Sequence, residues 1–340
     1  MVLKNILIIF SCFLITPSFA DTNSSDSHES SYLDYLHNTL SDDVYKFSNY
    51  VDNLLTAETG SDNNQSIHAN DSLDLFFQTN KFEKETRKSY LLINTSYTKQ
   101  TKYPNDFAYD IRAHLPLSKS THKYNLFIED LRPNDTAANI KSTSPTAVGV
   151  NYFSSDAYGI KSKYSLGISS IHPFVRARYS TDFEIGKWVL EPVQTFRYSL
   201  HYELEEETDI YFDRKISSDR LFRLLFYRHT GDTKVGMDYS FHIQYFHTLD
   251  SQTAFSISQS ASGNTKYKDI PYGTDPSLNH EEYSGINNYA TSMSWRQNIW
   301  KKWFFYEVRP GLNMHREHDY EINYSIVLSL DIYLGKTYIR

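Results

Sequence analysis

Residues 320–334 read YEINYSIVLSLDIYL, and their side chains alternate between two kinds. The even positions, from Tyr320 to Leu334, are all apolar or aromatic, whereas the odd positions include Glu321, Ser329 and Asp331. Successive side chains of a β-strand point to opposite faces, so this stretch predicts a strand with one apolar and one polar face. It is longer than a typical soluble strand of about six residues. It fits a tilted strand that crosses a membrane, which needs about 9–11 residues.

The same alternation recurs upstream. Between 233 and 247, for example, Tyr239 and Phe241 alternate with Ser240 and His242. Counting such stretches predicts about 14 strands, with 12 as the alternative because 208–214 is the weakest; both counts are even, as single-chain bacterial barrels require. The predicted strands are 88–98, 106–117, 121–131, 145–154, 158–169, 171–183, 187–201, 208–214, 218–229, 232–247, 252–262, 286–299, 302–316 and 320–334.

These strands predict an all-β fold, a transmembrane antiparallel up-and-down β-barrel over residues 72–340. The two longest connections, around 132–144 and 263–285, fall at one end of such a barrel. The tight connections near 118–120, 184–186, 248–251 and 300–301 fall at the other end. Long external loops and short periplasmic turns are typical of outer-membrane barrels. Trp188, Trp300 and Trp303 lie at strand ends, where an aromatic girdle is expected.

The N-terminus reads as an export signal. Lys4 precedes the apolar run 5–16, and Ser18 and Ala20 stand at the positions of a small-residue cleavage site, so a signal peptide spans 1–20 and the mature chain begins at Asp21. An apolar run of about 12 residues is too short for a spanning helix, which needs roughly 20. We therefore expect the outer membrane of a Gram-negative bacterium as the location. Cys12 lies inside this signal; a lipoprotein is the weaker interpretation, because Phe10 suits a lipobox poorly.

Residues 21–71 form a separate periplasmic segment. A polar leader (21–31) precedes a stretch, 32–56, in which apolar residues recur every three or four positions, the period of an amphipathic helix. A polar linker (57–71) follows. The apolar stripe needs a surface to pack against. Either the helix packs on the chain's own barrel or in a loose dimer, or it serves as a plug or an oligomerisation helix.

The composition agrees with a barrel. The formal net charge is −7 and no long basic run occurs, which argues against a nucleic-acid partner. Aromatic residues make up 16% of the chain, with 28 Tyr, yet the mean hydropathy is only −0.54. A helical membrane protein would be more apolar, whereas a barrel turns half of each strand to lipid and half to a polar interior.

The order SLDLFF (72–77), TRKSYLLINTSYT (86–98), DIRAHLPL (110–117) and KYNLFIEDL (123–131) resembles a group of uncharacterised proteobacterial outer-membrane β-barrel proteins. The C-terminal WFFYEVRPGLNMHREHDYEINYSIVLSLDIYLG is similar to their closing hairpin. The resemblance covers roughly 72–335 and implies a fold and a location, with no catalytic residues. Two features depart from usual barrels: Gly totals only 12, and the chain ends on Ile339-Arg340 instead of an aromatic residue.

Motifs for chemistry are weak, so we assign no catalytic, cofactor-binding or metal-binding residue. A lipase-like His-x-Ser occurs only at His28-Glu29-Ser30, in the polar leader. His315 and His318 are three apart and His242 and His247 five apart, spacings that point to opposite faces of a strand. A protease of the omptin type would need paired acidic groups near His318-Asp319, but the evident pair, Asp42-Asp43, lies in the helix.

Charged side chains on the polar faces are the remaining candidates. They either line a pore that selects anionic solutes or form ion pairs inside a barrel with little open lumen. A passive channel for small hydrophilic solutes is our first hypothesis, a structural or surface barrel the second, and an outer-membrane hydrolase the third. Expected partners are outer-membrane lipid, the barrel assembly machinery and a small solute, with oligomerisation open. The candidate pore-lining residues are Lys161, Lys163, Arg176, Arg178, Arg197, Arg223, Arg296, Glu307, Arg309 and Asp331.

Overall fold

The structure is a computed structural model, and it describes residues 34–44, 46, 76, 90–116, 124–130, 146–154, 158–268, 282–298, 301 and 303–334. The chain divides into two units, Met1–Ser41 and Asp42–Arg340. Helical residues cover 34–44 and 46, inside the predicted helix 32–56, and the other residues of that prediction fall outside the described ranges, as do the predicted signal peptide and linker. Among the described helical residues, no helix is long and apolar enough to cross a membrane.

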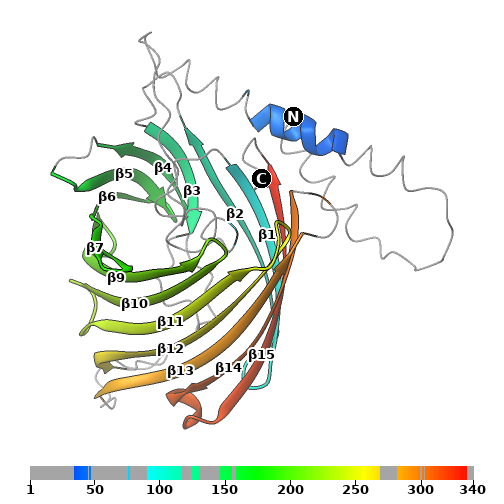
Figure 1. The fold of residues 1–340 in the computed structure, drawn as a ribbon. Coiled ribbons are helices and arrows are strands. Elements are labelled where there is room, and N and C mark those ends of the chain that lie inside the picture. Colours follow the sequence, from blue (N-terminus) through cyan, green and yellow to red (C-terminus); the bar gives the residue numbers. More distant parts are fainter. Residues whose placement is uncertain are drawn as a thin grey trace. The chain divides into compact units, whose positions relative to one another are not determined.

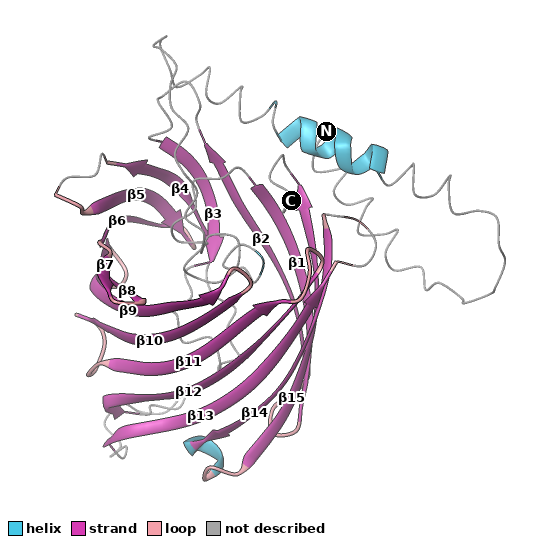
Figure 2. Cartoon of the chain, in the orientation of Figure 1, coloured by secondary structure: helices cyan, strands magenta, loops and turns pink. Residues whose placement is uncertain are grey.

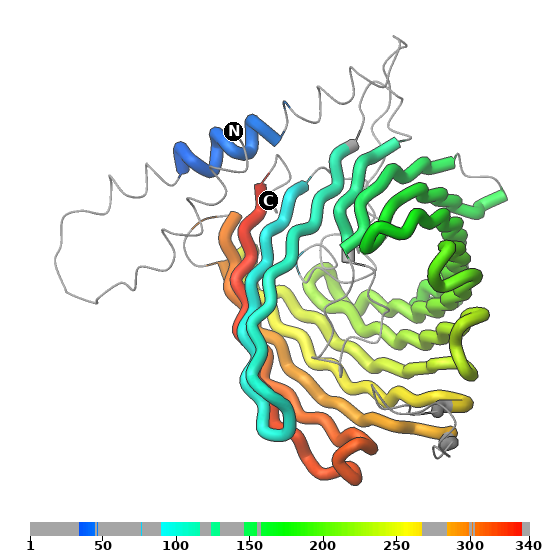
Figure 3. The backbone as a smooth tube through the Cα atoms, turned by 180° about the vertical axis from the view of Figure 1, so that it is seen from behind, coloured from blue at the N-terminus to red at the C-terminus, as the bar shows by residue number. Residues whose placement is uncertain are grey.

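Antiparallel strands that pair in sequence order make up the second unit (Figures 1 and 2). β1 pairs with both β2 and β15, so the first and last strands close the sheet into a ring, as Figure 3 shows from behind. The strands are β1 (Tyr90–Gln100), β2 (Asp106–Pro116), β3 (Tyr124–Asp130), β4 (Thr146–Phe153), β5 (Lys161–Ser169), β6 (His172–Ser180), β7 (Phe183–Ile185), β8 (Trp188–Ser199), β9 (Glu203–Ser217), β10 (Arg220–Gly231), β11 (Asp238–Thr248), β12 (Thr253–Lys268), β13 (Glu282–Gln297), β14 (Phe304–His315) and β15 (Ile322–Leu334).

The ring is a closed antiparallel barrel of 14 strands, which confirms the predicted fold class. β6 and β7 occupy one place in it, because both pair with β8 along successive segments. β6 corresponds to the predicted strand 171–183. β7 overlaps that prediction only at Phe183 and takes up most of the predicted turn 184–186, so the boundary predicted there was wrong. The turn pattern defines two rims. The terminal rim is where β1 begins and β15 ends, and the opposite rim carries the β1–β2 turn.

Two further predicted boundaries were wrong. The weakest predicted strand, 208–214, lies within β9, which runs for 15 residues because both neighbours, β8 and β10, pair with it. The predicted loop 263–285 is too long, since β12 continues to Lys268 and β13 begins at Glu282. Gly263 permits this extension: a Cβ there would lie 2.2 Å from the carbonyl oxygen of Gly285. The predicted connection 132–144 and the tight turn 118–120 fall outside the described residues.

Burial alternates along the strands as the sequence predicts. On β15, Ile326, Leu328 and Leu330 are exposed, whereas Ser329 and Asp331 are buried. The apolar residues therefore cover the outside of the barrel and the polar ones its inside. This is the arrangement of a barrel whose outer face contacts lipid, since lipid cannot solvate a polar group.

Tyrosine rings form a row on the outer face towards the terminal rim. Tyr124, Tyr152, Tyr164 and Tyr179 stand on the four successive strands β3 to β6, with ring centroids 4.9, 6.3 and 6.0 Å apart. Such a row suits the interface between lipid and water, where an aromatic ring with a polar tip is favoured. Trp303, which we predicted in the girdle, is instead buried in an apolar cluster that includes Tyr333.

Candidate functional site

The inward-facing wall of the barrel carries the candidate residues. Each lies on the strand face that also bears buried residues: Arg309 is two positions from Glu307, and Lys161 is two from Lys163. Arg223, Arg296, Glu307 and Asp331 are each exposed by less than a tenth. The polar faces predicted from the sequence therefore meet inside one barrel.

The first cluster joins β13, β14 and β15. Arg296 forms ion pairs with both Glu307, at 3.2 Å, and Asp331. Ser294 donates a 2.8 Å hydrogen bond to Glu307, and Arg309 donates a 3.0 Å bond to the same carboxylate oxygen. Two guanidinium groups thus share Glu307. This arrangement compensates the buried carboxylate, because a buried charge is tolerated only when it is paired and hydrogen-bonded.

A second set of pairs lines β8 to β10. Arg223 donates bonds of 2.7 and 2.8 Å to the two carboxylate oxygens of Asp213, and its guanidinium lies over the ring of Tyr211 at 5.3 Å. Arg197 donates a 2.6 Å bond to Glu205. These bonds cross from one strand to the next, so they fix the register of the inner wall as well as neutralising it.

Four of the candidate cations stand on two neighbouring strands, Lys161 and Lys163 on β5 and Arg176 and Arg178 on β6. Arg176 pairs with Glu129, Arg178 lies 3.7 Å from Asp209, and Lys161 lies 2.6 Å from Asp182. Neither β5 nor β6 carries an inward carboxylate, and other segments of the chain supply the partners. The sequence did not identify the partner of Arg176, because Glu129 stands on β3, three strands away from β6.

Two glycines shape the same wall. Asn125, Asn151 and Ser165 form a hydrogen-bonded row with bonds of 2.8 and 2.6 Å, and Arg176 donates to Ser165 at its end. Beside this row, a Cβ at Gly149 would lie 2.8 Å from the Phe127 ring, and one at Gly167 would lie 2.8 Å from Phe174. The two rings therefore occupy the space that a side chain at either glycine would need.

One inward cation, Arg309, has an exposed side chain at mid-barrel. The side chain of Arg309 is 44% exposed although it stands on the inward face of β14. Its register partner is Val327, near the middle of β15 (Ile322–Leu334). Arg309 therefore differs from Arg223 and Arg296, which are buried against their carboxylate partners.

The opposite rim ties the closing strands together. Lys102, in the β1–β2 turn, forms an ion pair with Glu321 in the β14–β15 turn, and this hydrogen bond lowers the pKa of Glu321. Partial burial raises the pKa of Tyr103 to about 12, and the nearby carboxylate of Glu317 adds to the effect. These contacts join the two turns on either side of the β1–β15 seam.

A serine and a histidine meet on one strand in a way that the sequence search overlooked. Ser240 and His242 on β11 lie 2.8 Å apart on the inward face, in the order Ser-x-His and not the His-x-Ser for which we searched. Both are almost fully buried, at 1% and 2% exposure, and no described carboxylate pairs with His242. A nucleophile that substrate cannot reach, and whose base has no orienting acid, gives little support to a hydrolase.

The other chemical candidates do not assemble into a site. His318 packs against the ring of Tyr103, and the ring of His315 accepts a hydrogen bond from the backbone of Glu317. Within the described ranges, no group of three or more His, Cys, Asp or Glu residues could hold a metal ion. His28-Glu29-Ser30 falls outside the described residues.

A closed antiparallel ring with an apolar outside and a paired polar inside defines a transmembrane β-barrel of the outer-membrane type. No protein-family model matches the chain, and no curated protein sequence matches it, so the resemblance to a group of uncharacterised barrels stays a prediction.

Several solved outer-membrane structures are similar to the chain. OmpT, an outer-membrane protein of Vibrio cholerae, is 7% identical, with a TM-score of 0.42 over 72% of this chain and 97% of that one. OccK2 (OpdF) of Pseudomonas aeruginosa is 9% identical, with a TM-score of 0.40 over 73% and 97%. The KdgM porin is 6% identical, with a TM-score of 0.34 over 71% and 98%. The class assignment rests on the strand pairing and the two faces of this chain itself.

Proposed function

We propose that the protein is a passive channel for small hydrophilic solutes in the outer membrane of a Gram-negative bacterium, with a preference for anions and with its N-terminal segment in the periplasm. The observation that carries the proposal is the solvated side chain of Arg309 at the middle of the inner wall. A polar lumen that admits water at mid-depth is the basic requirement of a diffusive pore.

The anion preference rests on the same residue. Arg178, Arg223 and Arg296 each face a carboxylate and are buried, so their charges are largely balanced where they stand. Arg309 shares Glu307 with Arg296, and its guanidinium remains open to the lumen. A solute passing this level therefore meets a cation first.

Conductance in planar lipid bilayers tests the proposal. Purified, refolded protein should give stepwise increases in current. In a salt gradient, the reversal potential should have the sign expected when anions permeate more readily than cations. Folded barrel that inserts, as judged by its protection from protease, but passes no current would overturn the channel.

A structural barrel without an open pore is the second candidate, and the pairing of the inward charges supports it. Ion pairs such as Arg223–Asp213 and Arg176–Glu129 join different strands of the wall to one another. If conductance is absent, this wall is the functional core of a scaffold, and loss of the protein should alter envelope integrity instead of solute uptake.

A further inference from the structure

An apolar cluster interrupts the polar inner wall at the terminal rim. It includes Tyr90 and Leu92 at the start of β1, Ala254 on β12, Phe305 on β14 and Tyr333 on β15. By strand alternation these residues face inward, since each stands two or four positions from an inward polar residue such as Asn94, Glu307 or Asp331. The end of the lumen at the terminal rim, here called the terminal mouth, therefore has an apolar lining next to the Arg296 cluster.

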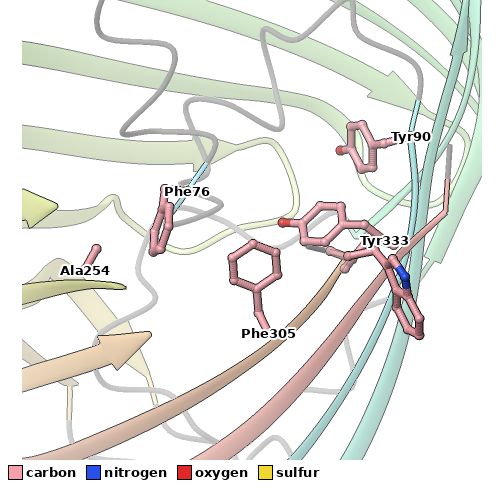
Figure 4. Close-up of a cluster of buried hydrophobic side chains, with 7 residues drawn as sticks. Phe76, Tyr90, Ala254, Phe305 and Tyr333 are labelled. Atoms are coloured by element: carbon pink, nitrogen blue, oxygen red, sulfur yellow. The ribbon is translucent and has the colours of Figure 1, made fainter. Parts of the chain in front are cut away.

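One member of this cluster does not belong to the barrel. Phe76 lies in the chain before β1, yet it is only 2% exposed and packs among the inward residues. Its ring meets that of Phe305 edge to face, with centroids 5.6 Å apart and an interplanar angle of 89° (Figure 4). In Figure 4 the Phe76 ring stands between Ala254 and Phe305. Phe76 thus adds a ring from outside the barrel strands to the inner face of the wall.

The contact is strong enough to hold a chain segment. Burying a phenylalanine side chain contributes about 1.5–3 kcal/mol, and an edge-to-face aromatic pair adds about 0.5–1.5 kcal/mol. Ala254, which is completely buried, leaves room for the ring where a larger side chain would fill it. The site also fits an aromatic ring better than a polar group, since the polar partners nearby are already engaged: Arg296 lies over the ring of Phe305 at 4.8 Å and pairs with Asp331.

We propose that Phe76 is an anchor, and that the cluster of Tyr90, Leu92, Ala254, Phe305 and Tyr333 is its binding site inside the terminal mouth of the lumen. The anchor fastens the chain at residue 76 to the inner wall and places a phenyl ring in the path of any solute that uses this mouth. The second consequence rests on the proposed channel function, whereas the first does not.

Cross-linking tests the anchor without reference to conductance. The mature chain is expected to contain no cysteine, because Cys12 lies in the predicted signal peptide. In the mature protein, Phe76→Cys combined with Phe305→Cys should join efficiently through a short bismaleimide, and the closed loop should change the gel mobility. The matched control is Phe76→Cys with Tyr306→Cys, because Tyr306 is the next residue of β14 and points to the other face. Equal cross-linking of both pairs, or of neither, would overturn the anchor.

A second probe is needed because Phe76→Cys removes the ring that is proposed to bind the cluster. A photoreactive benzoylphenylalanine at position 76 keeps an aromatic group there, and its cross-links should map by mass spectrometry to β12, β14 or β15. Adducts confined to other strands or to lipid would reject the site.

Conductance then tests the consequence. Phe76→Ala should raise the unitary current above that of the unaltered protein, if the channel exists. Cross-linking without any conductance would leave the anchor standing and reject the channel. Conductance without cross-linking between positions 76 and 305 would support the channel and reject the anchor.

Discussion

Arg223 on β10 and Asp213 on β9 form a two-pronged ion pair, with bonds of 2.7 and 2.8 Å, and both side chains are at most 2% exposed. The pair stands on the inward face between the rings of Tyr211 and Phe246. Removing one partner would leave a charge that water cannot reach. Removing one partner lowers the stability by more than the net contribution of the ion pair, because the remaining ion stays buried without a compensating charge.

We therefore expect Arg223→Met and Asp213→Leu each to lower the free energy of unfolding by about 3–5 kcal/mol, and the double variant to recover most of the loss. Urea unfolding in lipid vesicles measures this. The control pair is Lys102 and Glu321, whose side chains are 32% and 66% exposed and whose removal should change the free energy of unfolding far less, because solvent screens an exposed pair. Additive losses in the buried pair would show that the two residues do not act together.

The two faces of β15 should tolerate a cation very differently. Leu328 is 45% exposed on the outer face, whereas its neighbour Ser329 is 8% exposed on the inner face. A cationic side chain facing the bilayer midplane costs about 2–4 kcal/mol, and the polar interior can accommodate it. Leu328→Arg should therefore reduce the refolding yield into vesicles far more than Ser329→Arg. Equal yields would mean that the register of the barrel is wrong.

The glycines behind Phe127 and Phe174 should not accept a methyl group. A Cβ at Gly149 would lie 2.2 Å from the backbone oxygen of Leu166, and one at Gly167 would lie 2.9 Å from that of Val148. Gly149→Ala should destabilise the barrel by about 1–3 kcal/mol, and more than Gly167→Ala, since backbone yields less than a side chain. Gly311→Ala is the control, because its nearest neighbour is the Ser325 side chain at 3.1 Å. Thermal unfolding in detergent measures the loss of stability in the three variants. A larger loss for Gly311→Ala than for the other two would contradict the packing.

The barrel could be predicted from the sequence because its strands obey one simple period. Wherever apolar and polar residues alternate, as in 320–334, the predicted and observed strands agree within a few residues. β9 was underestimated because it begins ELEEETD, a run that strands disfavour locally. Its two neighbouring strands, which determine its length, are invisible to a local reading of the sequence.

For the candidate site, the sequence could predict only which face of its strand each residue occupies, and not which residues pair. Alternation places Arg176 inside, but its partner Glu129 comes from another part of the chain, so the charge balance depends on the closed ring. Phe76 illustrates the same limit. An isolated aromatic residue before a barrel carries no periodic signal, and its role follows from the residues that three-dimensional closure brings around it.

Export should remove the first twenty residues. The prediction rests on Lys4, the apolar run 5–16 and the Ser18-Phe19-Ala20 site. We expect the protein recovered from outer-membrane fractions to begin at Asp21, as read by N-terminal sequencing or intact mass. Recovery of the chain with residues 1–20 attached, or in the soluble periplasmic fraction, would refute it.

Arg309 should set the ion preference of the proposed channel. Its inward side chain is 44% exposed, whereas Glu307 beside it is buried and shared with Arg296. Neutralising it in Arg309→Gln removes the solvated cation and leaves Glu307 paired with Arg296, so the fold should survive. The permeability ratio of anions to cations should then fall, and Arg309→Glu should lower it further, because the local potential changes sign at a constriction of low dielectric.

The matched control is Arg214→Gln on β9, which removes an equal charge from the outer face, where Arg214 lies over the ring of Trp188 at 5.7 Å. Reversal potentials in a salt gradient provide the measurement, and protection from protease confirms that each variant is folded. A shift in Arg309→Gln but not in Arg214→Gln would place the selectivity at Arg309. Equal shifts in the two variants would indicate an effect of total charge, and unchanged potentials in a conducting protein would assign the preference to another part of the wall.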